Sequence, residues 1–193
     1  MHAKPDLRVF LKWMITRSGS VITDVIRLEM NLAIHGKSTL FQIPIERFTH
    51  MISIGDAGCD LTAFRPQSIA ASSQLCMNFR DRKTRERDDA PTEDDIWPLF
   101  QWLDSNIQIG GLLVHCGAGM SRSPAIALLA LCHIYPESDA LENMRYVASR
   151  SAAKYIWPNP LVVELGDNIM QRNGQIVSGA NKWRRTIEPD FAE

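Results

Sequence analysis

The ten residues from His115 to Pro124, HCGAGMSRSP, constrain the fold of this chain more than any other stretch. They follow a short apolar run at 111–115 and lead into a segment, 124–131, that is apolar on every side. A buried strand, a loop of mostly small residues and a buried helix, in that order, are typical of α/β proteins. We therefore expect a single layered α/β domain with a central, mainly parallel, roughly four- to five-stranded sheet flanked by helices.

Hydrophobic periodicity and turn residues predict the other elements of this domain. A helix is expected over 21–33, and the nearly all-charged run 80–89 is expected to be a solvated loop that can still carry a catalytic residue. Because Pro98 suits only the first turn of a helix, the helix that Thr92 introduces is expected to begin closer to Asp95. The expected strands are 39–45, 50–54, 74–79 and 111–115, and further helices are expected at 124–131, from Ser138, and from Asn159 to a point before Gly174.

The composition argues against several classes of protein. The length of 193 residues suits one domain, and a net charge of -1, from 21 basic and 22 acidic residues, gives no reason to expect a nucleic-acid partner. No apolar run is long enough to span a membrane, and the run 7–15 lacks a signal-peptide cleavage site. The four cysteines form no CxxC pair, which favours a reducing, cytoplasmic setting. No cluster of side chains has metal-ligand spacing, so we expect neither a metal nor a cofactor.

The spacing within HCGAGMSRSP brings a thiol and a guanidinium to one tetrahedral anion. Cys116 would lie at the base of the loop as a thiolate nucleophile, favoured by the positive field of the loop and of the following helix. Arg122 would donate two parallel hydrogen bonds to phosphoryl oxygens. The Ser121 hydroxyl is expected to donate to the cysteine sulfur, and His115 is expected to point away from the anion. The residues expected to bind the phosphate are Gly117, Ala118, Gly119, Met120, Ser121 and Arg122.

HCGAGMSRSP resembles the signature of the cysteine-dependent protein-tyrosine phosphatases, His-Cys-x5-Arg-Ser/Thr, and is most similar to that of their compact dual-specificity-like branch. Met51–Gly55 and Asn78–Asp81 resemble strands of that family, and Ala90-Pro91 and Pro158-Asn159-Pro160 resemble motifs of a bacterial subset. The resemblance implies a protein-tyrosine-phosphatase-like fold. It also implies hydrolysis of phosphotyrosine in a phosphorylated protein substrate through a phosphocysteine intermediate. A shallow pocket would also admit phosphoserine and phosphothreonine.

The resemblance further implies a general acid, an aspartate on a loop that protonates the leaving oxygen. The candidates are Asp81, Asp88 and Asp89. Asp81 is favoured because it follows the strand expected at 74–79, where the resemblance places the acid and where a side chain is held well enough to aim. Asp88 and Asp89 lie deeper in the charged loop and would reach the site by loop closure.

Other functions stay open on the sequence. A domain in which no aspartate reaches the anion would bind phosphotyrosine with little turnover. A phosphoinositide phosphatase is less favoured because 117–120 contains no lysine, although the five basic residues of 80–87 could supply positive charge. Rhodanese-like and arsenate-reducing proteins also hold a cysteine on an anion-binding loop. Separately, Cys76 or Cys59 could trap an oxidised Cys116 as a reversible disulfide.

The resemblance covers only the middle of the chain and therefore suggests three regions. Residues 1–47 match no part of the family core and are expected to be an N-terminal elaboration. Residues 48–174 are expected to form the phosphatase domain. Residues 175–193 are expected to be a polar, loosely held tail, of which Trp183 could dock.

Overall fold

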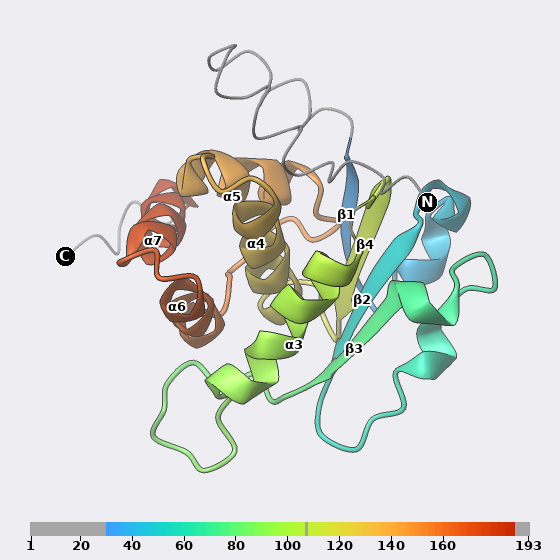
Figure 1. Cartoon of the computed structure of the whole chain (residues 1–193), viewed down its shortest axis with the longest axis horizontal. Helices are drawn as coiled ribbons and strands as arrows, with labels where there is room; N and C mark the ends of the chain where they lie inside the picture. The colour runs from blue at the N-terminus through green and yellow to red at the C-terminus, as the bar shows by residue number, and fades with distance from the viewer. Residues whose placement is uncertain (1–29, 107, 188–193) are drawn as a thin grey trace, which may run out of the picture. The chain divides into compact units, whose positions relative to one another are not determined.

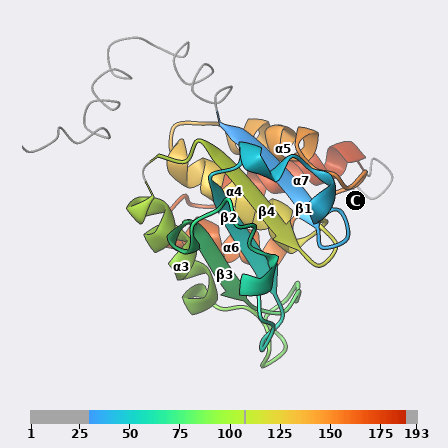
Figure 2. The same cartoon turned by 90° about the vertical axis from the view of Figure 1, so that its right-hand side faces the viewer.

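The computed structural model describes residues 30–106 and 108–187, and these form a layered α/β structure built on a four-stranded sheet (Figures 1 and 2). Figure 2 shows the strands side by side, in the order β1-β4-β2-β3, and all neighbouring pairs are parallel. The predicted fold class is confirmed. The strands are β1 (Asn31–Gly36), β2 (His50–Gly55), β3 (Gln74–Asn78) and β4 (Gly111–Cys116).

Strand β4 carries the signature cysteine and lies inside the sheet. His115 is level with His35 of β1 on one side and with Ser53 of β2 on the other. Because all the strands are parallel, their carboxyl ends meet at one edge of the sheet, which is where ligands bind in open α/β folds. The loop that follows Cys116 therefore begins at this edge.

The helices lie on one side of the sheet in Figure 1. Helix α4, which follows the signature loop, contacts the sheet through β1 and β4 and is itself covered by α3, α5 and α6. Its residues from Arg122 to Cys132 are all buried, as the continuous apolar run predicts. The helices are α3 (Glu93–Ser105), α4 (Arg122–Ile134), α5 (Ala140–Ser149), α6 (Pro160–Ile169) and α7 (Gln175–Ile187).

The other side of the sheet carries short 3-10 turns in place of helices (Figure 1). They lie in the two connections from β1 to β2 and from β2 to β3, and they close a second apolar core over the strands. The buried residues of this core are Ala33, Leu40, Phe48, Met51, Ile69 and Leu113.

Two predictions near the N-terminus are wrong where the structure describes them. The helix expected over 21–33 falls mainly outside the described residues, but its last part, Asn31–Ala33, is the beginning of β1. Here pairing with β4 and the burial of Leu32 and Ala33 outweigh the local helical pattern. The strand expected over 39–45 is instead two 3-10 turns, which bury Leu40 in the second core.

The strands expected at 50–54, 74–79 and 111–115 and the helices expected after Thr92, at 124–131, from Ser138 and from Asn159 are present, with boundaries that differ by a few residues. Helix α3 begins at Glu93 rather than near Asp95. The reason is a capping box in which the Thr92 N–H and hydroxyl both donate to the Asp95 carboxylate, at 2.8 and 2.9 Å. The Asp95 N–H donates to the Thr92 carbonyl at 3.2 Å. Pro98 consequently lies inside the helix, beyond its first turn.

The expectation of a loose polar tail is wrong for 175–187, which form helix α7. Gly179 of α7 lies against Ala140 of α5, where an added Cβ would come within 2.6 Å of the alanine methyl group. Trp183 is half-buried on this helix. The buried Asp167 carboxylate caps α7 by accepting main-chain hydrogen bonds at 2.6, 2.7 and 3.3 Å from Gly174, Ile176 and Val177.

The chain divides into two compact units, Met1–Met30 and Asn31–Glu193. Of the first unit, the structure describes only Met30. Strand β1 thus lies within 1–47, the region expected to be an elaboration, yet it pairs with the strand that carries the nucleophile. Within the described ranges, no helix is long and apolar enough to cross a membrane.

Candidate active site

The signature loop, 117–121, connects the end of β4 to the start of α4. Two glycines from different segments allow it to lie against the end of β1. Gly119 has a φ of 77°, and a Cβ there would lie 2.6 Å from the Gly36 nitrogen. A Cβ on Gly36 would lie 2.8 Å from the Ala118 carbonyl oxygen, and Lys37 donates its N–H to the Gly117 carbonyl at 3.0 Å. Strand β1 therefore supports the loop.

The Cys116 sulfur is buried at the base of this loop. It accepts the Gly119 N–H at 3.2 Å, which shows that the loop directs main-chain donors inward. A hydroxyl also lies beside the sulfur, but it belongs to Ser123, whose Oγ is 3.2 Å from Sγ. The prediction that Ser121 would donate to the sulfur is wrong in this structure, because the Ser121 hydroxyl donates to Asp81 instead.

Arg122 begins α4, and its side chain is only 11% exposed. One terminal nitrogen, Nη1, donates to the Asp56 carboxylate and to the Phe79 carbonyl, both at 2.8 Å. The other, Nη2, lies over Gly117 of the signature loop. The Nε atom is buried and has no hydrogen-bond partner among the described residues. A buried, unpaired donor on a cation is costly, and an anion in the loop would satisfy it.

The three candidate acids occupy different places. Asp81 lies beside the signature loop, where its Oδ1 accepts the Ser121 hydroxyl at 2.7 Å. Asp89 is held by Arg82 through two hydrogen bonds, at 3.0 and 2.7 Å, and by Arg80 at 3.2 Å. These ion pairs hold the pKa of the Asp89 carboxyl below its usual value.

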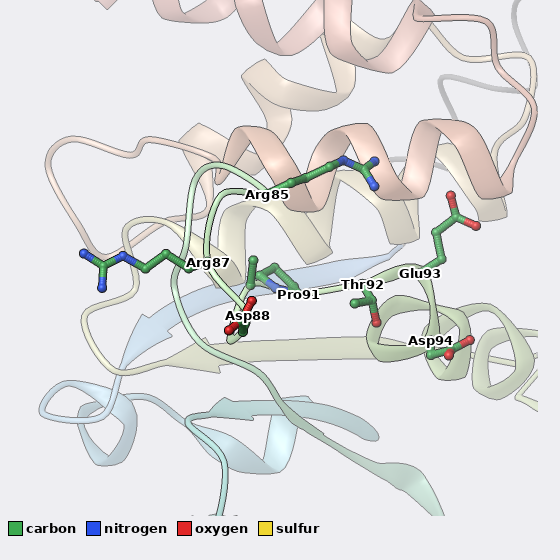
Figure 3. Close-up of a pocket in the computed structure, with 8 residues that line it drawn as sticks. Arg85, Arg87, Asp88, Pro91, Thr92, Glu93 and Asp94 are labelled. Carbon is green, nitrogen blue, oxygen red and sulfur yellow. The ribbon is translucent and has the colours of Figure 1, made fainter.

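Asp88 lies farther along the charged loop, in a pocket that the loop forms with the start of α3 (Figure 3). Of the three candidates, the described contacts bring Asp81 to the signature loop, through Ser121. The residues lining the pocket are Arg85, Arg87, Asp88, Ala90, Pro91, Thr92, Glu93 and Asp94.

His115 precedes the cysteine and is completely buried on the face of the sheet that the 3-10 turns cover. Its Nε2 lies 2.9 Å from the Ser53 hydroxyl, and its ring packs against Phe64 with the centroids 5.4 Å apart. These contacts place its ring away from the loop, as predicted. Burial, reinforced by the positive charge of Lys37, lowers the pKa of His115 to about 4, so the ring is neutral near pH 7.

Cys59, Cys76 and Cys116 are free thiols, and the Cys132 sulfur accepts a hydrogen bond from the Asn143 side chain at 3.3 Å. Cys59 and Cys76 are exposed, and Cys132 is buried like Cys116. Desolvation and the negative charge of Asp60 raise the pKa of the Cys76 thiol, which keeps it protonated and less reactive. The redox partnership with Cys116 stays a prediction. Among the described residues, no group of three or more His, Cys, Asp or Glu side chains could hold a metal ion.

The sequence analysis did not identify three residues that contact the site: Asp56 beside Arg122, Ser123 beside the Cys116 sulfur, and Asn159 beside Asp81. Ser123 follows Arg122 within the signature itself, so the pattern His-Cys-x5-Arg-Ser could have identified it. Asp56 follows the strand Met51–Gly55, at the same edge of the sheet as Cys116. Asn159 was expected only to start a helix, and its side chain also binds Asp81.

Comparison with known proteins gives a partial sequence match. No protein-family model matches the chain. A probable dual specificity protein phosphatase of Dictyostelium discoideum is 28% identical over 93 residues, which cover 46% of this chain and 36% of that protein. The chain thus matches little more than a third of that relative's length.

Solved structures share the fold. Human DUSP28 is similar with a TM-score of 0.54 at 15% identity, over 74% of this chain and 94% of that one. The Cydia Pomonella PTP-2 phosphatase gives 0.53 at 19% identity, over 72% and 84%. The human tyrosine phosphatase-like serine/threonine/tyrosine-interacting protein gives 0.50 at 22% identity, over 72% and 87%. The chain thus has the fold of these phosphatase and phosphatase-like structures, and with its signature loop it resembles the dual-specificity-like branch of the cysteine-dependent protein-tyrosine phosphatases.

Proposed function

We propose that this protein is a phosphatase that hydrolyses phosphotyrosine, and with it phosphoserine and phosphothreonine, in protein substrates. The observation that carries the proposal is the Arg122 guanidinium, held at Nη1 by Asp56 and Phe79 while its buried Nε has no partner among the described residues. The signature loop joins this arginine to a buried cysteine, Cys116, whose sulfur already accepts a main-chain N–H. A phosphate group above the sulfur satisfies both features.

The proposed reaction has two steps on Cys116. The thiolate attacks phosphorus, a P–S bond forms, the ester P–O bond breaks, and Asp81 gives its proton to the leaving oxygen. A water molecule then attacks the phosphocysteine while Asp81 takes its proton, and the P–S bond breaks to release phosphate. Ser123, 3.2 Å from the sulfur, is placed to donate a hydrogen bond to the thiolate as it leaves.

The charges around the site favour a protein substrate over a phosphoinositide. Three of the five basic side chains in 80–87 are already ion-paired within the protein. Arg80 and Arg82 bind Asp89, and Arg85 binds Glu164 of α6. Two carboxylates, those of Asp89 and Glu164, therefore offset part of the charge that this loop could offer to a multiply phosphorylated inositol ring.

The test is turnover of a phosphotyrosine peptide by the wild-type chain and by Cys116→Ser. The wild type is expected to release phosphate, and Cys116→Ser is expected to bind the peptide without turnover. Cys59→Ser, which changes an exposed thiol, is the matched control and should keep wild-type activity.

Three results would contradict the proposal. Peptide binding without turnover by the wild type would indicate a phosphotyrosine-binding module. Faster release of phosphate from a phosphoinositide than from the peptide would indicate a lipid substrate. Turnover of thiosulfate without release of phosphate would indicate a sulfur-handling enzyme.

A further inference from the structure

Asn159 connects three parts of the site through one buried side chain. It is completely buried immediately before α6, and its main-chain N–H donates to the Ser121 carbonyl at 3.1 Å. Its side-chain Nδ2 donates to Asp81 Oδ1 at 2.7 Å and to the Arg82 carbonyl at 2.9 Å. Its Oδ1 accepts the Val162 N–H at 3.1 Å, which caps the helix. The signature loop, the loop that carries Asp81 and α6 therefore meet at this residue.

The helix cap by itself does not require an asparagine. Aspartate, serine and threonine also accept the N–H of the third helical residue, and Asp139 caps α5 in this chain. Asparagine differs from them because its amide accepts with one atom and donates two hydrogen bonds with the other. Both of these donor bonds go to the segment at Asp81 and Arg82, so they serve that segment rather than the helix.

The Asp81 carboxylate is held through one oxygen. Oδ1 accepts the Asn159 amide and the Ser121 hydroxyl, each at 2.7 Å. Within the described part of the chain, Oδ2 accepts no hydrogen bond. Two short hydrogen bonds to a carboxylate oxygen are stronger than neutral ones and restrict rotation of the group. The carboxylate is thereby tied to the signature loop at one atom and leaves the other available.

We propose that Asn159 and Ser121 are positioning residues that aim Asp81 at the leaving oxygen of the substrate. This inference rests on the proposed function, because it assigns them a role in the proton transfer of that reaction. A general acid must come within hydrogen-bond reach of the oxygen that it protonates. The two donors to Oδ1 fix the direction in which the Asp81 carboxyl group points.

The test compares two substrates that differ in their need for the acid. Phenyl phosphate releases a basic phenolate that must be protonated, whereas 4-nitrophenyl phosphate releases a stabilised anion that leaves without a proton. Asn159→Ser keeps an N-cap acceptor for α6 but its hydroxyl cannot reach Asp81. We expect kcat/KM, which reports only the first step of the reaction, to fall about tenfold for phenyl phosphate and to change less than about twofold for 4-nitrophenyl phosphate.

Ser121→Ala removes the second donor with a smaller change to the buried structure, and it should shift the ratio of the two kcat/KM values in the same direction. Asn168→Ser, at an exposed position of α6, is the matched control and should leave the ratio unchanged. The melting temperature of each variant reports whether it is folded.

Equal losses of kcat/KM on both substrates would mean that Asn159 and Ser121 only maintain the fold, and would overturn the inference while leaving the proposed function in place. An unchanged ratio in Ser121→Ala and in folded Asn159→Ser would overturn it as well. A wild type that hydrolyses neither substrate would overturn the proposed function itself, and this inference with it.

Discussion

At the scale of single residues, the proposed function depends on one carboxylate, that of Asp81. We predict that Asp81→Ala lowers kcat on a phosphotyrosine peptide by about 100-fold or more, because the leaving oxygen then departs without a proton. Asp88→Ala is the control, since Asp88 lies in the pocket beside α3, and it should retain wild-type kcat. Steady-state kinetics on both variants check this, and a loss in Asp88→Ala alone would transfer the role of the acid to Asp88.

His115 gives the fold a dependence on pH. Its pKa is lowered from 6.5 to about 4, so between these values the unfolded chain binds a proton that the folded chain does not. Stability therefore falls as the pH drops through this window, by up to about 3 kcal/mol at its lower end. The pKa values of His35 and His50 are also lowered by burial, so they contribute in the same direction.

The comparison that isolates His115 is urea unfolding of the wild type and His115→Gln between pH 7 and pH 4.5. We predict that the variant is less stable at pH 7 but loses less stability on acidification, because its side chain does not titrate. Parallel losses in the two proteins would show that His115 is not the group responsible.

At the scale of elements, helix α7 depends on a cap supplied by α6. Three main-chain N–H groups at its start donate to the buried Asp167 carboxylate. We predict that Asp167→Asn lowers the free energy of unfolding by about 2 kcal/mol, because the amide turns an NH2 group or a weaker acceptor toward these donors. Asp94→Asn, an exposed change in α3, should cost less than about 0.5 kcal/mol. Urea unfolding measures both, and equal effects would contradict the assignment of the cap.

At the scale of the whole molecule, β1 and α7 lie outside 48–174, the region that the family resemblance covers. We predict that a fragment of 48–174 does not fold cooperatively, because it leaves one side of β4 unpaired and uncovers the face of α5 on which Gly179 packs. A fragment of 31–187 retains both and should unfold cooperatively. Thermal unfolding and size-exclusion chromatography test this prediction. The same cooperative transition in both fragments would show that 48–174 folds as a domain without β1 and α7.

The sequence supported correct predictions where the information was local. The strands at 50–54, 74–79 and 111–115 and the buried helix after Pro124 follow from short apolar patterns between clear breaks. Asn159 and Pro160 likewise marked the start of α6 correctly. The pattern failed at Asn31–Ala33, where pairing with a strand far along the chain decides the structure.

By itself, the sequence determined the α/β class and the loop that joins β4 to α4, because the cysteine, the glycines and the arginine stand within ten consecutive residues. Only the tertiary structure decided which side chains complete the site. Asp81 and Asn159 reach the signature loop, and Asp56 reaches Arg122 beside it, from three separate segments and through contacts that no local pattern encodes. Residues that follow parallel strands lie at one edge of the sheet. There the Ser123 hydroxyl lies beside the Cys116 sulfur, and the Ser121 hydroxyl donates to the Asp81 carboxylate.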